Sequence, residues 1–206
     1  MLASTSIFGM SSTGYLRQPQ EALTPEPSGE FAPLESILDD IQRAISARLY
    51  YPALVVALTI PEICSALALD KAVFIKESHY VAFVEKYIDA PELGVDGLRC
   101  YRLRGGVIHR ASAAGHPKFA ATHVLFTVPE SNFRMHGGGM LEVGEKTALP
   151  IDLQMFCSEM IRAARRWIED HRQEQKVIAN LPNLLSWRAD GMPPFIVGAP
   201  LVGSGE

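Results

Sequence analysis

The sequence predicts a mainly α-helical fold, a bundle of four to five helices with a short β-hairpin inserted before the last long helix. The composition, 48% hydrophobic and 20% charged over 206 residues, is that of one ordinary globular domain. Runs of β-branched residues are short, whereas apolar residues recur at helical spacing over long stretches. The clearest such stripe comprises Leu34, Ile37, Leu38, Ile41, Ile45 and Leu49.

Composition divides the chain into three parts. Residues 1–32 are rich in Ser, Thr, Pro and Gly and are expected to be a flexible leader. Residues 33–180 are expected to form the helical domain, and residues 181–206 an extended or disordered tail.

The net charge of −4 excludes a strongly basic protein that holds nucleic acid mainly through phosphate contacts. Three widely spaced cysteines predict buried, reduced thiols and a cytoplasmic protein.

The first half of the domain is predicted to be helical throughout. A helix begins near Pro33, and the apolar stretch 52–69 is expected to form two buried helical segments joined at residues 59–61. Pro61 and Glu62 interrupt this stretch, which disfavours a membrane-spanning helix, and no membrane partner is expected. Residues 79–88 are predicted to form a third helical region, because apolar residues recur there at spacings of three and four.

The second half combines helices with a small β element. After a turn at residues 89–95, Asp96 is expected to cap a helix through residues 97–114. The pair Gly105-Gly106 inside it indicates close packing or a bend. Residues 122–128 are predicted to form a strand that pairs in a hairpin with residues 140–143. Asp152 is then expected to cap the last long helix.

The sequence lacks the common catalytic motifs. It has no phosphate-binding glycine loop, no GxSxG and no HExxH. Its middle contains four histidines, but no Asp or Glu lies between residues 97 and 129 to complete a ligand set. No metal or other cofactor is therefore expected. The four histidines are His109, His116, His123 and His136.

The segment Arg99–Arg110 (RCYRLRGGVIHR) concentrates basic side chains on a predicted helix. Arg104 and His109 are five residues apart, about 140° round a straight helix, whereas Arg102 and His109 lie nearly on one face. Arg104-Gly-Gly-Val-Ile-His109 resembles the Arg-x(4–6)-His motif of the HEPN superfamily (higher eukaryotes and prokaryotes nucleotide-binding domain). The apolar pattern over residues 35–170 is also similar to a bacterial HEPN-like group, as in LYYPAL and ALTIPEIC on the second helical stretch.

This resemblance implies metal-independent cleavage of RNA in a homodimer, of a toxin or defence type. His109 would act as general acid or base, and Arg104 would hold the phosphate and stabilise its developing charge. Arg102 and Glu62 would support them, with Glu62 orienting a histidine or arginine. RNA and an antitoxin protein are the candidate partners.

Two alternatives remain open from the sequence. Gly105 stands where family members often carry a polar residue, and this favours a non-catalytic module that binds RNA or a nucleotide, or only dimerises. In the second alternative the protein is a helical adaptor. His109 would then be a hydrogen-bonded histidine at a helix end, and the arginines would form a solvated face.

Overall fold

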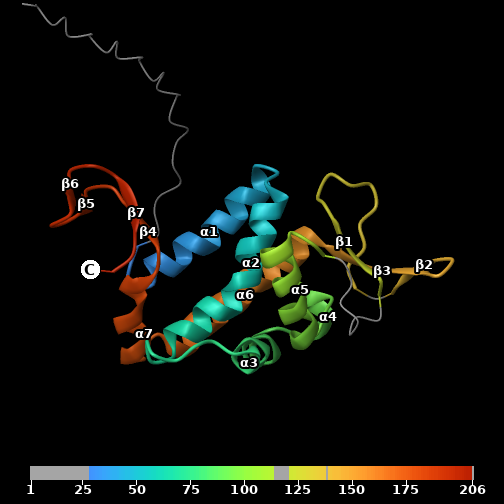
Figure 1. Ribbon diagram of the computed structural model, residues 1–206, viewed down its shortest axis with the longest axis horizontal. Coiled ribbons are helices and arrows are strands. Elements are labelled where there is room, and N and C mark those ends of the chain that lie inside the picture. The colour runs from blue at the N-terminus through green and yellow to red at the C-terminus, as the bar shows by residue number, and fades with distance from the viewer. Residues whose placement is uncertain (1–27, 114–120, 138, 206) are drawn as a thin grey trace, which may run out of the picture.

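The computed structural model describes residues 28–113, 121–137 and 139–205, and within them the chain is mainly helical. A body of packed helices lies between two small β elements, one at each end of the molecule (Figure 1). The predicted mainly α class is therefore confirmed. Most of the predicted leader lies outside the described residues.

Two long helices form the centre of the core. α2 (Tyr50–Leu67) packs against α1 (Ala32–Ser46), α3 (Glu77–Tyr87), α5 (Gly97–Arg110) and α6 (Leu153–His171). Four residues of the apolar stripe predicted for the first helix are buried, namely Leu34, Leu38, Ile41 and Ile45. Ile37 is partly buried, and Leu49, which lies beyond the end of α1, is 54% exposed. By length and composition alone, the segment Tyr50–Ala68 is apolar enough to span a membrane.

The two segments expected within residues 52–69 are one uninterrupted helix, so the predicted break at residues 59–61 is wrong. Pro61 lies inside α2, where it cannot donate the usual backbone hydrogen bond to Ala57. The helix continues because apolar residues before and after Pro61 are buried together, among them Leu58, Ile60 and Cys64. Tertiary packing outweighs the local cost of the proline.

α5 begins and ends with defined caps. Asp96 caps its start, as predicted, by accepting a hydrogen bond from the Arg99 amide at 2.7 Å. The helix runs through Gly105 and Gly106 without interruption but ends at Arg110, before the predicted residue 114. Ala111 adopts the left-handed conformation, and the Ser112 amide returns to the Gly106 carbonyl at 3.1 Å. A side chain on Gly106 would meet the Ser112 carbonyl oxygen at 2.6 Å.

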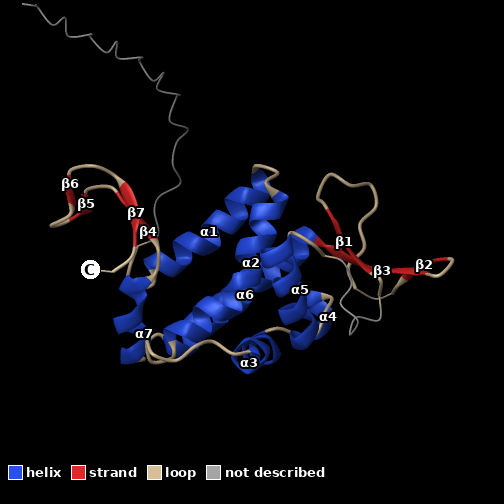
Figure 2. Ribbon diagram, viewed as in Figure 1, coloured by secondary structure: helices blue, strands red, loops and turns tan. Residues whose placement is uncertain are grey.

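The β element before α6 differs from the predicted hairpin. β1 (His123–Thr127) does not pair with β2 (Leu141–Val143). Both pair with β3 (Lys146–Asp152), β1 in parallel and β2 antiparallel, in the order β1-β3-β2 (Figure 2). β3 takes the centre because its last residues are buried, whereas β2 is largely exposed. Pro150 is accommodated because β2 pairs only with residues 146–148, so at Pro150 the strand has a strand neighbour, β1, on one side only.

α6 begins with a defined cap and is accompanied by two short helices. Asp152 caps α6 as predicted, accepting from the Met155 amide at 2.9 Å. α4 (Ala90–Leu93) occupies the predicted turn before α5, and α7 (Gln175–Asn180) follows α6.

Where an extended or disordered tail was expected, the structure has a short 3-10 turn (Leu181–Asn183) and two two-stranded sheets. These pair β4 (Ser186–Arg188) with β7 (Leu201–Gly203), and β5 (Gly191–Met192) with β6 (Ile196–Val197).

Candidate functional site

Arg104, His109 and Glu62 lie together at the surface where α5 crosses α2. One guanidinium nitrogen of Arg104, Nη2, forms an ion pair with Glu62 Oε2, and the other, Nη1, lies 3.4 Å from His109 Nε2. The side chains of Arg104 and Glu62 are 19% and 21% exposed, whereas His109 is exposed. The carboxylate is therefore sheltered at the base of the cluster, and the imidazole faces solvent.

The contact between arginine and histidine restricts the state of the imidazole. A guanidinium only donates hydrogen bonds, so His109 Nε2 must accept, and the ring proton of the neutral imidazole is then on Nδ1. The lone pair of the neutral imidazole is therefore directed at the Arg104 guanidinium, and His109 can act as a general base once Arg104 turns from Nε2 to a phosphate.

Arg102 belongs to a different pair. Its guanidinium contacts Glu77 at the start of α3, with 2.9 Å between Arg102 Nη2 and Glu77 Oε2. Of the two arginines considered from the sequence, Arg104 is thus the one beside His109. The long arginine side chain spans the angle between positions five apart on the helix. Glu77 was not identified from the sequence, because nothing local relates it to a residue 25 positions later.

A buried, uncharged residue, Tyr80, lies beneath the site. Tyr80 is fully buried, and its hydroxyl donates to the Leu58 carbonyl at 3.1 Å and lies 3.3 Å from Cys100 Sγ. Burial raises the pKa of Tyr80 well above its usual value, with further increases from Cys100 and Glu62. The phenol therefore stays protonated at neutral pH and supports the helices without taking part in proton transfer.

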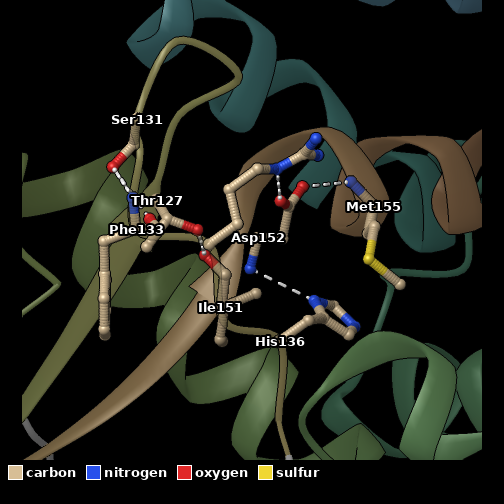
Figure 3. A network of polar contacts seen from close by, with 8 residues as sticks. Thr127, Ser131, Phe133, His136, Ile151, Asp152 and Met155 are labelled. Carbon is tan, nitrogen blue, oxygen red and sulfur yellow. Dashed lines mark hydrogen bonds and ion pairs between the residues drawn. The ribbon is translucent and has the colours of Figure 1, made fainter.

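Two other histidines considered from the sequence, His123 and His136, contact residues outside this cluster. His136 Nδ1 accepts the Asp152 amide at 3.2 Å (Figure 3). Its Nε2 lies 2.8 Å from the Glu92 carbonyl, so His136 joins the start of α6 to α4. Arg134 Nε donates to the Asp152 carboxylate at 2.6 Å in the same network. His123 contacts Thr122, and His116 lies outside the described residues.

Within the part of the chain that the structure describes, no group of three or more His, Cys, Asp or Glu side chains is placed to hold a metal ion. The three cysteines are free and buried, as predicted. Burial raises the pKa of Cys100 and of Cys157 to about 12. These thiols are therefore protonated and unsuited to serve as nucleophiles or metal ligands.

Comparison with known proteins adds no relative to this description. Neither the family models, nor the curated proteins, nor the solved structures contain a match to this chain.

Proposed function

We propose that this chain is a metal-independent endoribonuclease that works as a homodimer, with Arg104 and His109 at its active centre. The observation that carries the proposal is the contact between the Arg104 guanidinium and the His109 imidazole, with Glu62 behind the arginine. A cation that holds phosphate beside a base that accepts a proton is the minimum needed for RNA cleavage by its own 2′-hydroxyl.

The proposed reaction is transesterification within RNA. The 2′-oxygen attacks the adjacent phosphorus while His109 removes the 2′-hydroxyl proton. The bond from phosphorus to the 5′-oxygen breaks, and that oxygen takes a proton from the protonated imidazole of a second active-site histidine, His109 of the partner subunit. Arg104 neutralises the charge that develops on the phosphate. The products are a 2′,3′-cyclic phosphate and a free 5′-hydroxyl.

The dimer supplies what one chain lacks. Among the residues that the structure describes, a single chain offers one exposed histidine at this cluster, and its arginine charge is already offset by Glu62. Two copies facing each other through α5 would bring two such histidines and the neighbouring arginines to one cleft. Gly105 leaves open space on this helix, because a side chain there would meet no atom within 4 Å. A cytoplasmic location and an antitoxin partner form part of the same proposal.

The test is cleavage of a mixed-sequence RNA with chelator present, compared with DNA of the same sequence. His109→Ala and Arg104→Ala should each abolish cleavage, the RNA products should end in a cyclic phosphate, and DNA should survive. Arg102→Ala is the matched control, since it removes an arginine of the same helix that is paired with Glu77. Cleavage that persists in His109→Ala would refute the proposal.

A second function, RNA binding or dimerisation without cleavage, is favoured by the ion pair of Arg104 with Glu62, which occupies the guanidinium before any phosphate arrives. Under this alternative the wild type retains RNA in a filter-binding assay but produces no cyclic phosphate in any buffer. Light scattering decides whether the dimer common to both functions exists, and a monomer at tens of micromolar would remove the shared cleft.

A further inference from the structure

A second site lies apart from the Arg104 cluster, in an open pocket of about 250 Å³ between the C-terminal half of α2, α3 and the C-terminal half of α6. We propose that this pocket binds a small planar aromatic carboxylate that carries a second polar group at its far end, such as a hydroxybenzoate. None of Glu62, Arg104 and His109 lines it, so this proposal is independent of the proposed ribonuclease.

The walls of the pocket are aromatic and held in fixed positions. The Trp167 and His171 rings stack with centroids 4.3 Å apart and planes 19° from parallel. Phe83 and Tyr87 contact each other at 5.1 Å on the facing helix α3. All four residues line the pocket, where Trp167, Phe83 and Tyr87 are 3%, 4% and 7% exposed. The parts of these fixed rings that reach the pocket provide apolar contacts for another ring at little entropic cost.

The size of the pocket limits the ligand. Pockets for drug-sized molecules measure about 300–1,000 Å³. At about 250 Å³, this pocket is matched to a molecule of one ring with its substituents.

One end of the pocket presents a free hydrogen-bond donor. His79 Nδ1 accepts the Lys76 amide at 3.1 Å, so the proton of the neutral imidazole is on Nε2. Within the described residues, Nε2 has no hydrogen-bond partner. The Ser65 hydroxyl donates to the His79 carbonyl at 3.3 Å and fixes this turn of α3 beside α2. A ligand hydroxyl or carbonyl oxygen suits this end.

The other end presents a cation. Lys86 Nζ lies 2.7 Å from the Tyr87 hydroxyl and 3.0 Å from Asp170 Oδ2, which leaves the third ammonium proton for a ligand. Hydrogen bonds to Tyr87 and then Asp170 raise the pKa of Lys86, so the group is charged at neutral pH. No Asp or Glu is among the residues that line the pocket. The polar group at this end is therefore an acceptor, and a carboxylate makes the strongest such bond.

The placement of the two donors sets the form of the ligand. His79 and Lys86 are seven residues apart on α3, two turns along one face, with Ala82 between them. A carboxylate alone cannot contact both donors, whereas a ring with polar groups at opposite ends can. The spacing of His79, Ala82 and Lys86 is visible in the sequence, but the facing rings of α6 come from a segment more than 80 residues later.

The experiment is isothermal titration calorimetry of the full chain with para-hydroxybenzoate, para-hydroxybenzamide and benzoate. The hydroxybenzoate should bind at one site per chain. Lys86→Met should weaken its binding by about tenfold and should weaken the benzamide binding by less, because the amide carbonyl accepts a weaker hydrogen bond than a carboxylate does. Benzoate, which lacks the far oxygen, should bind more weakly than the hydroxybenzoate. Ala82→Leu, at an exposed helical position, should block all three ligands.

Lys176→Met is the matched control, because Lys176 is another exposed lysine paired with an aspartate, Asp70 at 3.0 Å, and it does not line the pocket. This variant should bind like the wild type. Absence of binding at millimolar para-hydroxybenzoate overturns the proposal. Equal weakening by Lys86→Met and Lys176→Met also overturns it, because the effect would then come from net charge. Urea unfolding of each variant confirms that the fold is intact.

Discussion

Replacement of Asp152 tests how the sheet is joined to the longest helix. Its side chain is 3% exposed, caps α6 through the Met155 amide and accepts from Arg134 at 2.6 Å. Asp152→Ala removes both interactions. Loss of a helix cap costs about 1 kcal/mol, and loss of the charge-assisted hydrogen bond from a half-exposed arginine costs about 1 kcal/mol more. The free energy of unfolding should therefore fall by about 2 kcal/mol.

Asp152→Asn separates the two interactions. Asparagine caps helices nearly as well as aspartate, so this variant should lose only the ionic part, about 1 kcal/mol. The hydrogen bond to His136 Nδ1 comes from the backbone amide of residue 152 and is retained in both variants. Urea unfolding at neutral pH, followed by circular dichroism, measures the two losses.

The pH dependence gives an independent check. Burial by itself raises the pKa of Asp152, but hydrogen bonds from Arg134 and Met155 and the charge of Arg134 outweigh it, so the net pKa is lowered. An unfolded aspartate has a pKa of about 3.9. The stabilisation is therefore complete well above this value and is lost as the pH falls through the lower folded pKa. The gap between wild type and Asp152→Asn should shrink below about pH 4. A gap that does not change with pH, or a loss in Asp152→Ala under about 0.5 kcal/mol, would refute the reasoning.

Two further predictions concern α5 and the cysteines. Gly106→Ala should destabilise the protein by about 1 kcal/mol or more, since the new Cβ would meet the Ser112 oxygen at 2.6 Å. Gly105→Ala, at an open position of the same helix, should stabilise it by up to about 1 kcal/mol; urea unfolding of both measures the contrast, and equal effects would contradict the geometry. All three cysteines should react with a thiol reagent such as DTNB only after unfolding, because they are buried and burial raises their pKa values. Rapid labelling of the native protein would show that the core opens locally.

The sequence alone indicated which residues form most of the candidate site. Arg104, His109 and Glu62 were singled out by a short motif and a resemblance, and they do lie in contact. The sequence did not show which residue each arginine contacts. The helical wheel favoured Arg102, but side-chain length lets Arg104 reach His109, and Glu77 on another helix holds Arg102. Residues of the aromatic pocket were missed for the same reason, because three helices distant in sequence assemble it.

Local chemistry determined much of the rest. The helical stripes and the caps at Asp96 and Asp152 follow from interactions within a few residues, which sequence spacing records directly. Tertiary structure alone decided that α2 continues through Pro61 and that β3 lies between β1 and β2. Pro61 disfavours a continuous helix locally, and the burial of apolar surface by distant segments outweighs that preference. Such burial depends on which faces meet in space, and no pattern within one segment encodes it.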